Sequence, residues 1–257
     1  MPFPHYPDKH AEEALVRPAG FHAFLREIGK HPTFEVPEAV ILCYQASLLD
    51  HVREHHPGPS GDGYLAHMLL PEDAGGRVGV YGGFGVGAPV AAVRLEDLIA
   101  FGVRRVVSIG TAGSLQPDLG IGDLVVCEGA IRDEGTSHHY LPADEDARAS
   151  VPLTGRLSAA LDAHGRAHRS GTTWTTDAPY RETKAEVRHY QAEGVLTVEM
   201  EAAALFAVAA CRGIDLAAAF SVSDTLADLT WTPRFGSPET REGLEALYRA
   251  ALDTLSG

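Results

Sequence analysis

Short apolar runs alternate along the chain with segments whose apolar positions recur at helical spacing. The run AVILCY at residues 39–44 is typical of a strand buried on both faces. Further strands are predicted at 77–81, 103–109, 123–127 with more strand material at 131, and 216–222, and helices at 20–29, 89–101, 153–166, 198–212 and 240–255. This alternation predicts an α/β fold in a single domain (1–257), with the sheet covered by helices on both faces. Residues 1–35 are polar, rich in histidine and punctuated by proline, and are interpreted as an N-terminal arm.

Charge and composition exclude several classes of protein. The 257 residues have a formal net charge of −14, which disfavours nucleic acid and anionic membranes as partners because both need a basic surface. No apolar run reaches membrane-spanning length, and the N-terminus has no apolar signal core. The cysteines Cys43, Cys127 and Cys211 lie far apart in apolar settings, so we expect buried, reduced thiols in a cytoplasmic protein.

Glycines mark the ends of two predicted strands, at residues 82–87 (GGFGVG) and 110–113 (GTAG). In α/β sheets, ligands bind beyond the carboxyl ends of strands, where backbone N–H groups are free. Each stretch taken alone is also explained as a tight turn from strand to helix. The first stretch lacks the glycine spacing of a dinucleotide site and the acidic residue that should follow it, and the chain has no Walker loop. A dinucleotide oxidoreductase and an ATP enzyme are therefore disfavoured.

Four segments, read together, resemble the nucleoside phosphorylase and nucleosidase superfamily. They are GGFGVGAP (82–89), SIGTAGSLQ (108–116) with IGDLV (121–125), VEMEAAA (198–204) and SVSD (221–224); the stretch 131–140 is also similar to phosphorylases. The branch includes uridine phosphorylase, hexameric purine nucleoside phosphorylase and methylthioadenosine nucleosidase. The resemblance implies a mixed central sheet and a homo-oligomer, dimer-based and up to a hexamer. It also implies a nucleoside substrate, phosphate as co-substrate and no other cofactor.

The VEMEAAA segment is implied to hold the sugar. By resemblance, Glu201 accepts hydrogen bonds from the ribose hydroxyls, Met200 packs on the sugar face, and Glu199 supports the site. Cleavage of an N-glycosidic bond passes through an oxocarbenium-like sugar, which nearby carboxylates stabilise. The alternative is that two glutamates simply open an alanine-rich helix, where negative charge suits the helix N-terminus.

Asp224 follows a predicted strand and is implied, together with Ser223, to lie beside the base. In purine-cleaving relatives an aspartate at the matching place protonates the departing base, whereas pyrimidine-specific relatives carry a Gln and an Arg in a loop that here reads TWTTDAPYRE (173–182). A purine substrate is therefore favoured. Helix capping is the alternative for Asp224. Trp174 is implied to stack on the base, or else to pack in the core. The remaining substrate-binding candidates are Phe84, Gly85, Thr111, Ala112 and Gly113.

The chain departs from phosphorolytic relatives in the residues expected to bind phosphate. Tyr44-Gln45 stands in place of a Gly-Asp-Pro-x-Arg segment, Ser108 stands in place of an arginine, and residues 58–70 contain no arginine that could reach a neighbouring subunit. Phosphate is best held by guanidinium groups, although Arg132, Arg181 or a neighbour's histidine could replace them. We therefore place phosphorolysis only slightly ahead of hydrolysis. A nucleoside-binding protein without turnover is the third reading, which the retained acids Glu201 and Asp224 disfavour.

The histidine pairs at 55–56 and 138–139 have no carboxylate or cysteine at ligand spacing around them. We expect no metal site, since this chemistry needs none. A histidine of the partner's N-terminal arm contacts the 5′-hydroxyl in some relatives, and His5 and His10 are the candidates here.

Overall fold

The computed structural model describes residue 6 and residues 9–257; His5 lies outside the described residues. Ten strands form one mixed sheet. They are β1 (Ala39–Cys43), β2 (Met68–Leu69), β3 (Val78–Gly82), β4 (Arg105–Ser114), β5 (Leu124–Asp133), β6 (Ala147–Arg148), β7 (His168–Thr176), β8 (Thr197–Glu199), β9 (Asp215–Thr225) and β10 (Thr232–Pro233). The helices are α1 (Pro18–Glu27), α2 (Ala46–His55), α3 (Ala88–Ala100), α4 (Val151–Ala163), α5 (Lys184–Ala192), α6 (Ala202–Arg212) and α7 (Pro238–Ser256).

The sheet closes on itself over half of its strands. The order is β10-β9-β5-β7-β8-β4-β1-β3-β2, and an additional pairing of β4 with β9 joins β9, β5, β7, β8 and β4 into a ring. The pairs β1–β3, β1–β4, β4–β9, β5–β7 and β7–β8 are parallel, whereas β5–β9 and β4–β8 are antiparallel. The predicted α/β class with a mixed central sheet is confirmed.

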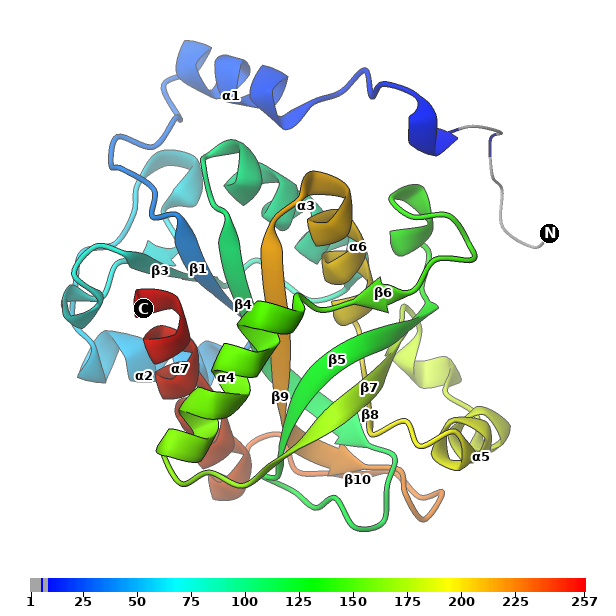
Figure 1. Cartoon of the computed structure of the whole chain (residues 1–257). Helices are drawn as coiled ribbons and strands as arrows, with labels where there is room; N and C mark the ends of the chain where they lie inside the picture. Colours follow the sequence, from blue (N-terminus) through cyan, green and yellow to red (C-terminus); the bar gives the residue numbers. More distant parts are fainter. Residues whose placement is uncertain (1–5, 7–8) are drawn as a thin grey trace.

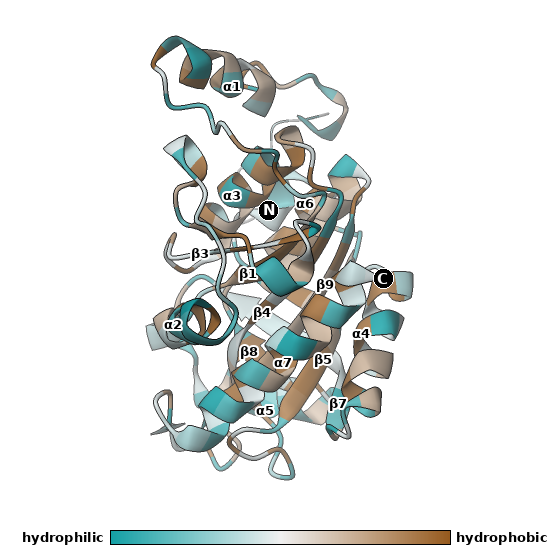
Figure 2. Cartoon of the chain, turned by 90° about the vertical axis from the view of Figure 1, so that its left-hand side faces the viewer, coloured by the Kyte–Doolittle hydropathy of each residue, from teal (hydrophilic) through white to brown (hydrophobic). Residues whose placement is uncertain are grey.

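Helices cover both faces of the sheet. On one face, α3 and α6 bury leucines and Phe206 against β4, β5 and β9. On the other face, α2, α4 and α7 bury a second leucine-rich cluster, and α4 and α7 lie side by side in Figure 1. In Figure 2, α2, α4 and α7 carry both hydrophilic and hydrophobic residues. Each fully buried large apolar side chain contributes about 1.5–3 kcal/mol relative to exposure, so the two clusters hold the strand ends in fixed positions.

The N-terminal arm crosses one end of the molecule. The Phe21 ring lies 5.2 Å from that of Tyr64, and His22 stacks on Phe101 at 3.6 Å. His10 contacts the backbone carbonyl of His138 at 3.1 Å. In Figures 1 and 2, α1 lies at the end opposite to α5. The predicted helix at 20–29 is thus α1.

Several elements differ from the prediction. The helix predicted at 198–212 begins only at Ala202, because residues 197–199 form β8 and pair with both β4 and β7. The helices α2 and α5 and the strand β7 were not predicted from the sequence. The first two are short and mostly polar, and β7 is rich in threonine with one large apolar residue, Trp174.

The expectation of three buried thiols is wrong for one cysteine. Cys43 and Cys127 are buried, but Cys211 is exposed because it lies in the last turn of α6, on the side facing away from the sheet. None of the described helices combines the length and apolar character that a membrane crossing requires.

Candidate active site

A cavity of about 490 Å³ opens around the last residues of β1, β4, β8 and β9. Its wall contains the carboxylates of Glu182, Glu199, Glu201 and Asp224. Uncharged polar residues also line it, namely Tyr44, Gln45, Ser108, Thr111 and Ser223, together with apolar residues that include Val86, Met200, Leu226, Trp231 and Phe235. The position agrees with the rule that ligands bind beyond the carboxyl ends of strands in such sheets.

Most of the predicted site residues line this one cavity. Segments far apart in the sequence contribute them: Thr111, Ala112 and Gly113 from β4, Glu199, Met200 and Glu201 from the β8–α6 junction, and Ser223 and Asp224 from β9. Trp174, Phe84 and Gly85 do not line it.

The β8–α6 junction holds two buried carboxylates with different tasks. Glu199 accepts hydrogen bonds from the Thr175 hydroxyl and from the backbone N–H groups of Glu201 and Ala202, the latter two at 2.8 Å. It therefore stabilises the start of α6. Glu201 accepts a hydrogen bond from the backbone N–H of Gly87, which connects the glycine-rich stretch to the cavity. Burial raises the pKa of both carboxyls, and the charge of Glu199 raises that of Glu201 further.

Asp224 is held as a hydrogen-bond acceptor at the end of β9. The Ser223 hydroxyl donates to one carboxylate oxygen at 2.7 Å, and the Trp231 indole N–H donates to the other at 2.9 Å. Asp224 lies within β9, opposite Gly113 of β4, so the alternative of a helix cap does not apply. A Cβ on Gly113 would lie 2.9 Å from an Asp224 carboxylate oxygen and 2.8 Å from the Leu226 side chain, so a larger residue here would have to displace these side chains.

Neutral polar side chains lie at the place where phosphorolytic relatives are expected to carry phosphate-binding arginines. The hydroxyls of Tyr44 and Ser108 lie 3.1 Å apart, and the Gln45 side chain donates to the Thr111 hydroxyl at 3.0 Å. No Lys, Arg or His side chain of the described residues lines the cavity. Neither Arg132 nor Arg181, the two arginines suggested from the sequence as replacements, lines the cavity.

Arg132, one of those replacements, is fully used elsewhere. Its guanidinium donates to the Ser137 hydroxyl at 2.9 Å and to the carbonyls of Leu141, Pro142 and Glu145. It thus stabilises the turn after β5. Arg181 is exposed and does not line the cavity.

The placement of Trp174 corrects the expectation that it stacks on a base. Its side chain is 1% exposed and packs 4.7 Å from the Tyr190 ring, and its N–H donates to Asp133 at 2.9 Å. Successive side chains of a strand point to opposite faces, and the next residue, Thr175, is the one that reaches Glu199. Trp174 is therefore a core residue.

Phe84 and Gly85 also lie outside the cavity. Phe84 stacks on Tyr81 with ring centroids 5.3 Å apart and contacts Tyr44 edge-on at 5.6 Å, so it supports the cavity wall from behind. Gly85 adopts φ +100°, a conformation that favours glycine, and allows the chain to turn into α3.

Three residues that line the cavity, Glu182, Trp231 and Phe235, were not identified as site residues from the sequence. Glu182 follows a short 3-10 turn, Pro179–Arg181, and precedes α5. Burial, followed by the charges of Asp224 and Glu186, raises its pKa to about 7. Trp231 and Phe235 reach the cavity because β10 pairs with β9. The acidic residue at the end of the segment 173–182 is the signal in the sequence that points to Glu182.

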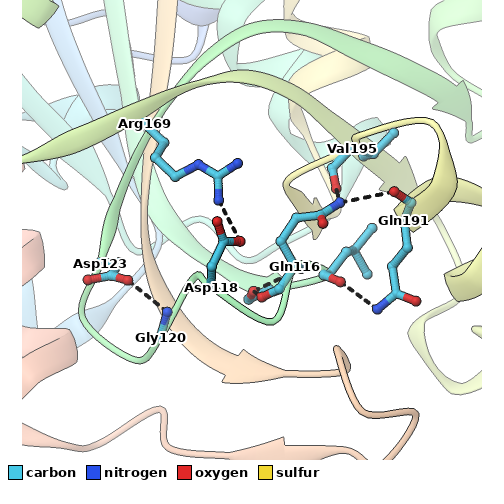
Figure 3. A network of polar contacts seen from close by, with 9 residues as sticks. Gln116, Asp118, Gly120, Asp123, Arg169, Gln191 and Val195 are labelled. Carbon is cyan, nitrogen blue, oxygen red and sulfur yellow. Dashed lines mark hydrogen bonds and ion pairs between the residues drawn. The ribbon is translucent and has the colours of Figure 1, made fainter.

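A network of amide side chains anchors α5 to the strands of the site. The Gln191 side chain donates to the carbonyls of Leu115 and Ala227 at 2.6 and 2.8 Å. Gln116 donates to the carbonyl of Val195 at 2.7 Å (Figure 3). Neighbouring contacts join Arg169 to Asp118 and Gly120 to Asp123. The loop that carries Glu182 is therefore attached to a fixed support.

The fold and the acidic cavity at its strand ends define a nucleoside phosphorylase-like α/β protein. The structure is similar to that of purine nucleoside phosphorylase from Toxoplasma gondii in complex with immucillin-H, with a TM-score of 0.76, 20% identity, and coverage of 86% of this chain and 91% of the other. The sequence of residues 37–252 matches the family model of the phosphorylase superfamily. The chain belongs to this superfamily, as its sequence motifs indicated.

Curated relatives differ in the nucleoside named for them. The chain is 38% identical over 146 residues to guanosine phosphorylase of Halorubrum lacusprofundi, covering 55% of this chain and 59% of the relative. It is 35% identical over 154 residues to a DeoD-type purine nucleoside phosphorylase of Caldanaerobacter subterraneus subsp. tengcongensis, covering 59% and 66%. It is 31% identical over 144 residues to uridine phosphorylase of Escherichia coli K12, covering 51% and 57%. The matches thus span between about half and two thirds of these relatives.

Proposed function

We propose that the protein cleaves the N-glycosidic bond of a nucleoside, with a purine favoured, and transfers the sugar to phosphate to give the free base and ribose 1-phosphate. The observation that carries this proposal is the convergence of Glu201 and Asp224 on one cavity. The cavity of about 490 Å³ lies within the range of small-molecule sites. The named relatives are nucleoside phosphorylases, which agrees with this chemistry.

The buried carboxylates suit the sugar end of such a substrate. Ribose hydroxyls would donate to Glu201, which also accepts a hydrogen bond from the Gly87 N–H. As the bond to the base breaks, positive charge develops on the sugar, and a carboxylate in a water-poor cavity stabilises it more strongly than it would in water. Met200 supplies an apolar surface beside the same group. Glu201 therefore acts on the transition state as well as on binding.

The other end of the cavity suits a purine. Asp224 lies there with Leu226, Trp231 and Phe235, which provide apolar and aromatic surface for a flat base. A carboxylate accepts hydrogen bonds from ring N–H groups of a purine. The absence of the pyrimidine pattern from 173–182 favours a purine as well. The guanosine and purine names of two relatives agree with this preference.

Phosphate would lie beside Ser108, Thr111 and Gln45, whose polar groups face the cavity. Because a phosphate dianion needs positive charge as well as donors, we propose a homo-oligomer in which a neighbouring subunit supplies the cation. No metal enters this mechanism. Among residue 6 and residues 9–257, no group of three or more His, Cys, Asp or Glu side chains is arranged to hold one.

Hydrolysis is the second candidate function, and one observation favours it. The part of the cavity wall that the described residues form contains four carboxylates and no basic side chain. A hydrogen bond to a charged group contributes about 1.5–3 kcal/mol, so the loss of several arginines weakens phosphate binding by orders of magnitude. Water needs no cation and could occupy the space between Ser108 and Thr111.

Product analysis separates these functions. The protein is incubated with a panel of purine and pyrimidine nucleosides, with and without phosphate, in oxygen-18-labelled water. Dependence on phosphate with ribose 1-phosphate as product supports phosphorolysis, whereas labelled free ribose at an undiminished rate without phosphate supports hydrolysis. Binding without turnover across the panel would contradict both and would leave a nucleoside-binding protein. Glu201→Ala serves as the inactive control.

A further inference from the structure

Two carboxyl groups, on different elements, line the apolar end of the cavity. Asp224 is part of β9, and Glu182 belongs to the loop between β7 and α5. Trp231 donates a hydrogen bond to Asp224, the Phe235 ring lies 6.3 Å from that of Trp231, and Leu226 also lines the cavity. A purine base in this cavity would therefore contact two acids, and the structure distinguishes between them.

The hydrogen bonds of the two carboxyls differ. Asp224 accepts one hydrogen bond on each oxygen, from Ser223 and from Trp231. For Glu182, no hydrogen-bond donor and no ion-pair partner is found among residue 6 and residues 9–257, and no basic side chain of these residues lines the cavity. Donors to both oxygens stabilise the charged form of a carboxylate, whereas a carboxyl without donors favours the protonated form.

The charges around Glu182 act in the same direction. Asp224 on β9 and Glu186 on α5 are the charged groups that influence it, and both are acidic. Two carboxylates in one site cannot both hold their charge easily, so one takes a proton. Burial and the charge of Asp224 raise the pKa of Glu182 to about 7. At neutral pH this side chain therefore has a proton available for transfer.

The loop that carries Glu182 is firmly attached. The adjacent residue, Thr183, forms a capping box with Glu186 at the start of α5. At the end of α5, Gln191 donates to the carbonyls of Leu115 and Ala227, which directly follow or lie close to β4 and β9. A proton donor must be held within hydrogen-bond reach of its acceptor, and this framework provides the required support.

We propose that Glu182 donates the proton that allows the base to leave, while Asp224 remains a carboxylate and holds an N–H group of the base. This proposal rests on the proposed nucleoside cleavage. The bond between the anomeric carbon and the base nitrogen breaks, and its electron pair stays on the base. The proton of the Glu182 carboxyl moves to a ring nitrogen of the base, and the acceptor oxygen of phosphate or water bonds to the anomeric carbon; water, where it is the acceptor, releases one proton to solvent. Glu182, now a carboxylate, regains its proton from solvent.

The test compares two substrates with Glu182→Gln. Guanosine needs a proton for its base to leave, whereas 7-methylguanosine carries a positive charge on its base and leaves as a neutral molecule without one. We expect Glu182→Gln to lower kcat on guanosine by about 100- to 10,000-fold, and to change kcat on 7-methylguanosine by less than about threefold. KM for guanosine should change little. Retained activity on 7-methylguanosine also shows that the variant is folded.

The pH profile provides a second readout. For the wild type, kcat on guanosine should fall above about pH 7, following the titration of Glu182, and this fall should be absent in Glu182→Gln. Arg181→Gln is the matched control, because Arg181 is the exposed neighbour that does not line the cavity, and it should behave as the wild type.

Two results would overturn the proposal while leaving nucleoside cleavage in place. One is an equal loss of kcat on both substrates, which would make Glu182 a residue that binds or positions. The other is wild-type activity of Glu182→Gln on guanosine. A wild-type protein that cleaves neither substrate nor any other nucleoside would instead contradict the proposed function itself.

Discussion

In the absence of ligand, Glu201→Gln should raise the free energy of unfolding of the protein. The same substitution should weaken the binding of ribosides. The Glu201 side chain is 8% exposed, it lies close to the carboxylate of Glu199, and its pKa is raised by burial and by that second charge. The amide of glutamine has nearly the same shape, and its oxygen can still accept the hydrogen bond from the Gly87 N–H. The substitution therefore removes charge while it preserves packing.

The sign of the effect follows from the direction of the pKa. A carboxyl whose pKa is higher in the folded state binds its proton more tightly there than in the unfolded chain, where the value is 4.5. Its contribution to stability is complete below that value and is lost as pH rises through the folded-state pKa. Glutamine does not titrate. The variant should therefore match the wild type most closely near pH 5 and exceed it increasingly toward pH 8.5.

The size of the gain can be bounded. Each unit by which the pKa is raised corresponds to about 1.4 kcal/mol, and the buried amide of glutamine offsets part of the total. We expect a gain of about 1–3 kcal/mol at pH 8.5, or roughly 3–9 °C in Tm for a chain of this length. Binding should change in the opposite direction. Two hydroxyl contacts that lose their charged partner cost about 2 kcal/mol together, which is about 30-fold in Kd.

The assay is thermal unfolding of the wild type, Glu201→Gln and Glu199→Gln at pH 5, 7 and 8.5. Glu199→Gln is the matched comparison, because both Glu199 oxygens accept hydrogen bonds and the amide presents an NH₂ group to one set of donors. That variant should lose about 1–3 kcal/mol. The reasoning is refuted if Glu201→Gln is less stable than the wild type at pH 8.5, or if both variants shift alike.

Four further predictions concern the base end, the core and the assembly. Asp224→Asn removes a charge that raises the pKa of Glu182, so the alkaline fall of kcat should move to lower pH. The turnover of purine nucleosides should drop far more than their binding. An unchanged pH profile would contradict this prediction. Gly113→Ala places a Cβ 2.9 Å from an Asp224 oxygen and should lower kcat at least about tenfold by displacing that carboxylate, whereas wild-type kinetics would show that the strands adapt. Trp174→Phe should destabilise the protein by about 1–2 kcal/mol in urea titrations, through loss of the hydrogen bond to Asp133, with KM unchanged; a raised KM would return Trp174 to the base site. Sedimentation should find a homo-oligomer, and a fully active monomer would contradict the proposal that a neighbour completes the phosphate site.

The sequence alone determined the elements whose signal is local. The apolar run that contains β1 is continuous because both faces of a central strand are buried, and it was readable without any partner. The glycines at 82–87 mark the end of β3 as predicted, whereas those at 110–113 lie within β4, which continues to Ser114. The motif residues Glu201 and Asp224 were also available from their order along the chain. Short polar elements such as α2 and α5 were missed because their helical pattern is weak over so few residues.

Only the tertiary structure decided which side chains share the cavity. Trp174 and Thr175 are adjacent in sequence, but the pleat of β7 directs one into the core and the other toward Glu199. From the sequence alone, Arg132 was a candidate phosphate ligand, but its guanidinium donates to groups of the turn after β5. Glu182 gains its role from Asp224, which a strand on another part of the sheet brings into the same cavity. Such relations depend on non-local pairing, above all that of β4 with β9, and no local pattern of residues encodes them.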